Sequence, residues 1–189
     1  MKTIYDFSEQ ERIAFMEVYS KFKVKENETK HLHITYNNST SSFDCFIHVY
    51  NQDGNKVSSS IIEIKVRNTH YTDLLIENYK YNKLRRLEKI EKQNFDKVNL
   101  YYLVFTTAGT YLFNLNTVPQ IDWQNDSMPA TTFQADKNII KKVGYLNIQD
   151  AINFNYIFDP STVDNNKVKK QFIQQKIDRC IFNSIQKLK

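Results

Sequence analysis

The feature that most constrains this fold is a pair of β-prone runs on either side of Asp53-Gly54. The first is FDCFIHVYN, residues 43–51, and the second is VSSSIIEIKVR, residues 57–67; both are rich in β-branched and aromatic residues. Asp-Gly between two such runs predicts a β-hairpin with a two-residue turn. The hairpin register then decides which side chains share a face of the sheet.

This register places two acidic residues opposite each other on neighbouring strands. A turn at residues 53 and 54 places Asp44 directly opposite Glu63, and the Cβ atoms of directly opposed residues lie about 4.5 to 5.5 Å apart. Lys65 belongs to the same face, because side chains alternate along a strand. A β-bulge between residues 44 and 63 would shift this register. The opposite face is wholly apolar and is predicted to lie under a helix layer: Cys45, Ile47, Val49, Ile62, Ile64 and Val66.

Opposed carboxylates destabilise a strand pair unless positive charge lies between them, and a divalent cation would supply it. The alternative is an exposed ion pair on an edge strand, in which Lys65 neutralises Glu63 and contributes little. Two observations favour the first interpretation. The run is apolar enough for a central strand, and the third charged residue, Asp44, is an acid.

The remaining chain predicts two helices, a further strand before the hairpin, and a second hairpin. Residues 8–23 and 71–93 have apolar residues at helical spacing, the second helix with Thr72 as its cap. Residues 31–37, 99–107 and 110–116 read as strands, the last two joined by a turn at Ala108-Gly109. The expected fold is α/β, of the α+β kind, with a mixed central sheet between helices.

We expect one domain, with a core over residues 1–118. Residues 119–189 are expected to form a loop-rich excursion and a basic C-terminal helix packed on the same domain. That helix, residues 168–189, carries an apolar stripe, for which a homodimer contact is the second interpretation and a DNA-embracing arm the third. Residues 165–189 contain seven Lys or Arg and one Asp, and the whole chain has a net charge of +5.

This basic tail favours a polyanionic partner, nucleic acid before membrane, although a solvated helix face is the commoner explanation. No apolar run approaches the roughly 20 residues of a membrane span, and the N-terminus lacks the apolar core of a secretory signal. Cys45 and Cys180 form no metal-binding or disulfide pattern and are expected to be buried or inert. A cytoplasmic protein is expected.

The order of elements and the charged motif together resemble the PD-(D/E)XK (restriction-endonuclease-like) nuclease superfamily, most closely its small phage and bacterial members. The matching residues are Asp44 in SFDCF and Glu63-Ile64-Lys65 in IIEIK. The resemblance covers residues 8–116 as an αβββαβ core. Phe43 stands where the family pattern has Pro.

The resemblance implies a hydrolase that cleaves phosphodiester bonds, an endonuclease or exonuclease for which DNA is favoured over RNA. It assigns Asp44, Glu63 and the backbone carbonyl of Ile64 as ligands of Mg²⁺ or Mn²⁺, and hard oxygen donors suit such ions. It also implies that Lys65 orients the attacking water or stabilises charge in the transition state.

The resemblance extends to two helical residues. Glu11 would be a further metal-facing acid, although a first-turn Glu also suits the helix dipole. Lys80 would point at the active site, with Lys83 competing for this role, although a lysine can equally snorkel from an apolar stripe. Lys141 and Lys142 are candidates for contacts to the nucleic-acid backbone.

Two other functions stay open. One is a nuclease-like domain without turnover that binds nucleic acid or serves as an assembly module. The other is an interaction protein that acts through its basic C-terminal helix.

Overall fold

The computed structural model describes residues 4–34, 44–130 and 137–159. The fold is α+β, with two sheets and two α-helices in this part of the chain. The elements in chain order are α1 (Ile4–Val18), the 3₁₀ turn η1 (Tyr19–Lys21), β1 (Glu28–Ile34), β2 (Cys45–Asn51), β3 (Lys56–Val66), β4 (Asp73–Glu77), α2 (Asn78–Glu91), β5 (Lys97–Thr106), β6 (Gly109–Asn114), β7 (Gln124–Pro129), β8 (Asn138–Asn147), the 3₁₀ turn η2 (Ile148–Asp150) and β9 (Ile152–Asn153).

The larger sheet is mixed and has the strand order β1-β2-β3-β5-β6-β9. Only β3 and β5 are parallel, and the other neighbours run antiparallel. The parallel pair is possible because β4 and α2 form a long connection between its two strands. β3 therefore lies inside the sheet, with an antiparallel neighbour on one side and a parallel neighbour on the other.

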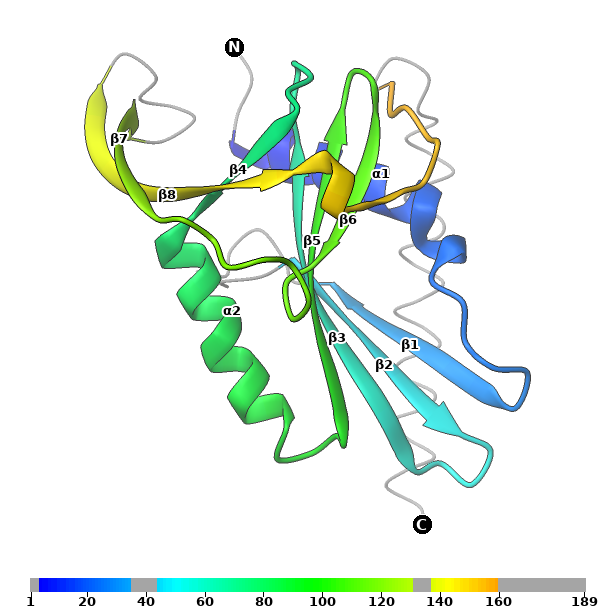
Figure 1. Ribbon diagram of the computed structural model, residues 1–189. Helices are drawn as coiled ribbons and strands as arrows, with labels where there is room; N and C mark the ends of the chain where they lie inside the picture. Colours follow the sequence, from blue (N-terminus) through cyan, green and yellow to red (C-terminus); the bar gives the residue numbers. More distant parts are fainter. Residues whose placement is uncertain (1–3, 35–43, 131–136, 160–189) are drawn as a thin grey trace.

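A helix covers each face of the larger sheet, with α1 on one side and α2 on the other (Figure 1). Side chains alternate along β3, so that Ile62 and Ile64 pack with Phe15 of α1, whereas Ile61 packs with Leu84 of α2. All five side chains are at most 1% exposed. The prediction that the apolar face of the hairpin lies under a helix is confirmed.

The hairpin between β2 and β3 is confirmed, but its turn differs from the prediction. Gln52, Asp53 and Gly54 form a three-residue loop, in which the Gly54 N–H donates to the Asn51 carbonyl at 3.0 Å. Gly54 is the last residue of this loop, and its φ of +79° is a left-handed conformation that favours glycine. The two-residue turn at Asp53-Gly54 was therefore wrong by one position, because Asp-Gly also suits the end of a three-residue loop.

A β-bulge at Val57 restores the predicted register further along the hairpin. Tyr50 pairs with Lys56 near the loop, whereas Val49 pairs with Ser58 and Cys45 with Ile62. The extra residue compensates for the longer loop. From Val49 to Cys45, the strands therefore pair as a two-residue turn would have dictated. The pairing of β2 with β3 ends there, and the Asp44 N–H donates to the Ile62 carbonyl, so the predicted pairing of Asp44 directly opposite Glu63 is not part of the ladder.

The second predicted helix begins later than expected. Residues 73–77 form β4, which pairs with β8, and α2 starts at Asn78. Glu77 is the N-cap residue, so the assignment of Thr72 as the cap was wrong. The apolar run Leu74-Leu75-Ile76 fits a strand as well as a helix, and pairing with a strand some 70 residues away decides between them.

The expected loop-rich excursion is also corrected, because it contains strands. β7 and β8 form an antiparallel pair and join β4 in a second, three-stranded sheet. β7 (QNDSMP) is polar and largely exposed, so it lacks the alternation that predicts a strand. The predicted C-terminal helix, residues 168–189, and Cys180 lie outside the described residues. Within the described part of the chain, no helix is long and apolar enough to cross a membrane.

Candidate functional site

The candidate site lies where β2 and β3 part. Their recorded pairing begins at Cys45 and Ile62, while β3 continues to Val66 against β5. Asp44 stands at this junction. Its backbone N–H donates to the Ile62 carbonyl at 3.0 Å, and its carboxylate Oδ2 accepts from the Ile64 N–H at 2.6 Å. The Asp44 side chain thus caps a backbone donor on the side of β3 that faces β2.

The carbonyl of Ile64 points to this same side. In an antiparallel ladder, paired residues exchange both of their backbone hydrogen bonds, so the N–H and C=O of one strand residue project together. The Ile64 N–H meets Asp44, and its carbonyl therefore projects toward the same strand edge. An oxygen donor of the main chain and the Asp44 carboxylate lie side by side.

Three further charged side chains join Glu63 at this end of the sheet. The Lys65 ammonium lies 2.8 Å from Glu11 Oε1 and 3.5 Å from Glu63 Oε1. Lys80 Nζ contacts the same Glu63 oxygen from α2. The Glu63 side chain is only 2% exposed, so its charge is offset by two lysines and not by water.

Helical periodicity explains how the two helices supply their residues. Glu11 precedes Phe15 and Val18 by four and seven positions, which places it on the face of α1 that enters the core. Lys80 precedes Leu84 and Leu87 by the same intervals on the inner face of α2. Both side chains therefore project toward the sheet, one from each helix layer.

The charges shift the pKa of Asp44. Burial raises the pKa of Asp44 to about 7, and the negative charges of Glu63 and Glu11 act in the same direction. Lys65 and the hydrogen bond from the Ile64 N–H oppose this shift but do not cancel it. Asp44 thus lies close to two other carboxylates, Glu63 and Glu11, which disfavour its ionised form. Carboxyl groups perturbed in this way are frequent in functional sites.

The same charges also shift the pKa values of two neighbouring groups, Lys65 and Cys45. Burial alone would lower the pKa of Lys65, but Glu63, Glu11 and Asp44 together raise it well above its ordinary value. Lys65 therefore stays charged at neutral pH. Burial, reinforced by Asp44 and Glu63, raises the pKa of the Cys45 thiol well above its ordinary value. Cys45 is a buried free cysteine, as predicted, and is a poor nucleophile.

The structure brings together Glu11, Asp44, Glu63, Lys65 and Lys80, all five of the side chains that the sequence named for the catalytic centre.

Lys83 lies elsewhere, with its ammonium 4.1 Å from the centre of the Tyr79 ring. The two residues are four positions apart in α2 and share a helix face, which explains why Lys83 meets Tyr79. Of the two lysines that were candidates to point at the active site, Lys80 contacts Glu63 and Lys83 lies over Tyr79.

The donor set is all oxygen, as Mg²⁺ prefers: two carboxylates and one carbonyl. Among the described residues, no three His, Cys, Asp or Glu side chains form a group that could hold a metal ion. The assigned ligands include only two such side chains, Asp44 and Glu63, with Ile64 contributing backbone. Glu11, expected as a further metal-facing acid, forms an ion pair with Lys65 in the structure. Lys80 contacts Glu63 Oε1, so an ion bound at that oxygen would have to displace its ammonium.

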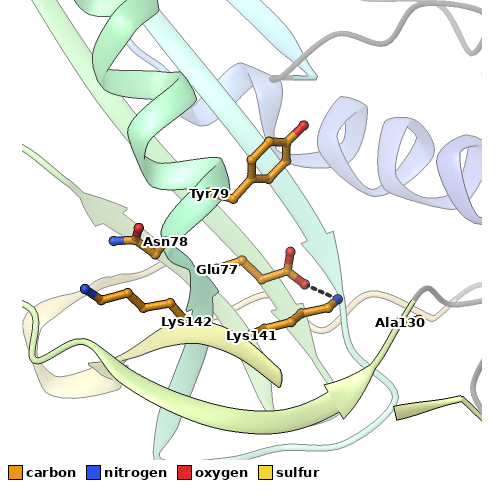
Figure 2. A pocket seen from close by; sticks show the side chains of 6 residues that line it. All are labelled: Glu77, Asn78, Tyr79, Ala130, Lys141 and Lys142. Atoms are coloured by element: carbon orange, nitrogen blue, oxygen red, sulfur yellow. Dashed lines mark hydrogen bonds and ion pairs between the residues drawn. The ribbon is translucent and has the colours of Figure 1, made fainter. Parts of the chain in front are cut away.

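A pocket of about 360 Å³ lies between the start of α2 and β8. Figure 2 shows Glu77 and Lys141 directed toward each other across it, and their charged atoms are 2.9 Å apart. The lining residues are Glu77, Asn78, Tyr79, Ala130, Lys141 and Lys142. Lys141 and Lys142 were candidates from the sequence, but the pocket itself was not expected, because it depends on the pairing of β4 with β8.

No protein-family model matches this chain, and no curated protein or solved structure matches it. Neither a family nor a function therefore follows from similarity to known proteins. A function has to be argued from the charged cluster and its surroundings.

Proposed function

We propose that this protein is a metal-dependent nuclease of the restriction-endonuclease-like type, which hydrolyses phosphodiester bonds, with DNA as the preferred substrate. One observation carries the proposal. Glu11, Asp44, Glu63, Lys65 and Lys80 come from α1, from the residue before β2, from β3 and from α2, and they meet at one end of a central strand.

The element order supports the same proposal. A helix, three antiparallel strands, a long connection with a second helix, and a strand parallel to the third make up the first part of the fold. This order is compatible with the αβββαβ core that the resemblance implies. β4, inserted before α2, is an addition to it.

A purely stabilising ion-pair network explains the cluster less well. Buried ion pairs recover their desolvation cost only with excellent geometry, and apolar residues often replace them without loss. Here a third acid, Asp44, is placed where burial and two other carboxylates disfavour its charge. Such an arrangement reduces stability, whereas it suits a site that receives a cation.

The residues divide into two groups by charge. Asp44, Glu63 and the Ile64 carbonyl would hold Mg²⁺ or Mn²⁺. Such an ion, when bound, lowers the pKa of a coordinated water and neutralises charge that develops on phosphate. In the metal-free cluster the carboxylates raise the pKa of Lys65, so its ammonium would offer a positive charge to phosphate. Glu11 holds the Lys65 ammonium in place at 2.8 Å.

Cleavage of linear, circular and branched DNA with Mg²⁺, with Mn²⁺ and with EDTA tests the proposal. We expect metal-dependent cleavage that Lys65→Ala lowers by about 10²- to 10³-fold, as expected when a preorganised charge in the active site is removed. Lys56→Ala, at the exposed start of the same strand, is the control and should cleave like the wild type. Cleavage that persists in EDTA, or that Lys65→Ala leaves undiminished, would contradict the mechanism.

One observation favours a second candidate, a nuclease-like domain that binds nucleic acid without turnover. Lys80 contacts a Glu63 oxygen that a metal would need, and so partly neutralises that ligand. Binding of DNA without cleavage under all metal conditions would support this candidate. Lys80→Met separates the two, because a nuclease should show altered metal affinity and a pure binding module should not.

A further inference from the structure

The pocket at the start of α2 adjoins the proposed active site. Three of its lining residues, Glu77, Asn78 and Tyr79, immediately precede Lys80, which contacts Glu63. The pocket and the charged cluster thus share the first turn of one helix. A substrate strand that reaches Glu63 and Lys65 would pass close to this pocket.

The pocket combines positive charge with an exposed aromatic ring. Lys141 is held by Glu77, whereas Lys142 is exposed and has no ion-pair partner among the described residues. Tyr79 is 60% exposed even though Lys83 lies against its ring. In Figure 2, the Tyr79 side chain lies on the same side as the Glu77–Lys141 pair, while Lys142 points away from it alongside Asn78.

We infer that an unpaired stretch of the substrate strand lies over this pocket, with one base against Tyr79 and a phosphate further along the same strand near Lys142. The inference rests on the proposed nuclease function and narrows its substrate to nucleic acid with a single-stranded part. A nucleobase stacks on an aromatic ring only when it has left its neighbours in the duplex.

Size and charge favour a nucleotide over other ligands. A volume of about 360 Å³ falls at the lower end of the roughly 300 to 1,000 Å³ that is usual for small-molecule sites. A free phosphate would not need an aromatic side chain beside it, and an acidic peptide would not need a flat aromatic surface to bind. A single strand can use both the ring and the cation, because successive nucleotides present bases and phosphates along its length.

Binding of a fluorescein-labelled 12-nucleotide oligo(dT), followed by anisotropy in EDTA, tests this inference without any cleavage. Tyr79→Ala should weaken binding at least about fivefold at both 50 and 200 mM salt, because stacking is lost. Tyr79→Phe should bind like the wild type. Tyr71→Ala is the matched control, since Tyr71 is 58% exposed but lies outside the pocket, and it should also leave binding unchanged.

The proposed contact between Lys142 and a phosphate is tested by the salt dependence of binding. Lys142→Gln should reduce the slope of log affinity against log salt by about 0.7, as expected for one phosphate contact to a single strand. Lys89→Gln, an exposed lysine in the last turn of α2, should leave the slope unchanged. Inorganic phosphate should not displace the oligonucleotide at equal phosphate concentration.

The inference is overturned if the wild type does not bind oligo(dT), if Tyr79→Ala binds normally, or if Tyr71→Ala weakens binding equally. Displacement by inorganic phosphate with no effect at Tyr79 would reduce the pocket to an anion site and also overturn it. These results are separable from the nuclease proposal. A protein that binds through Tyr79 but never cleaves contradicts only the proposed function, and one that cleaves but ignores Tyr79 contradicts only the inference.

Discussion

Replacement of Asp44 by Asn isolates the cost of holding three acids together. The pKa of this carboxyl rises from 3.8 to about 7 on folding, chiefly through burial and then through Glu63. The folded state therefore disfavours the ionised form. Relative to a side chain that is always neutral, the wild type loses stability as the pH rises from about 4 to about 7, and the loss is complete above 7.

At 1.36 kcal/mol per pKa unit, this loss is about 4 kcal/mol above pH 7. Asn keeps an acceptor for the Ile64 N–H but brings an amide N–H₂ group that needs its own partner, which reduces the gain. We therefore expect Asp44→Asn to stabilise the metal-free protein by about 2 to 4 kcal/mol at pH 8. Because the cost of the amide group does not depend on pH, the gain should be smaller by about 3 kcal/mol at pH 4.5 than at pH 8.

Urea unfolding in EDTA at the two pH values measures both effects. Asp53→Asn, an exposed acid in the hairpin loop, is the control and should change the free energy of unfolding by less than about 0.5 kcal/mol. A destabilised Asp44→Asn variant at pH 8, or a gain that does not grow with pH, would refute the account of the cluster as electrostatically strained.

Two further predictions concern packing and charge pairing. Gly144→Ala in β8 should lower the free energy of unfolding, measured in urea, by about 1 to 3 kcal/mol, because the added methyl group would overlap the Ile121 side chain and lie 3.2 Å from the Trp123 ring. An unchanged urea midpoint would show that these side chains can move aside. Lys80→Met should lower the free energy of unfolding by about 1 to 2 kcal/mol at pH 7, because the buried Glu63 loses one of two cations and the lysine is partly solvated. The same substitution at an exposed lysine of α2 should have no measurable effect, and equal losses at both positions would contradict the pairing.

The charged cluster could be predicted from the sequence because the alternation of side chains along a strand and the spacing along a helix do not depend on the exact turn length or helix start. The predicted turn was one residue too short, and the bulge at Val57 was not foreseen, yet their effects on the register cancel between Val49 and Cys45, which leaves Asp44 near Glu63. Lys80 was placed correctly by its spacing from Leu84 and Leu87, although the helix begins later than expected. Local periodicity was sufficient for these residues.

The second sheet and the pocket could not be predicted for a physical reason. Glu77 and Lys141 are far apart in the chain, and β4 and β8 become strands only because they pair with each other. β7 is mostly exposed and polar, so nothing in its own pattern distinguishes it from a loop. Such elements depend on long-range pairing, which a single sequence does not reveal.

The bulge at Val57 ties the length of a distant loop to the chemistry of the cluster. A single residue added to or removed from the tip at 52–54, with no second change, would exchange the two faces of β3 relative to β2. Glu63 would then no longer meet Asp44, although every residue of the cluster would still be present. In homologous chains, a one-residue change in the length of this loop would therefore have to accompany gain or loss of the bulge. Selection would act on whether the combined number of loop and bulge residues is odd or even, and not on the loop sequence.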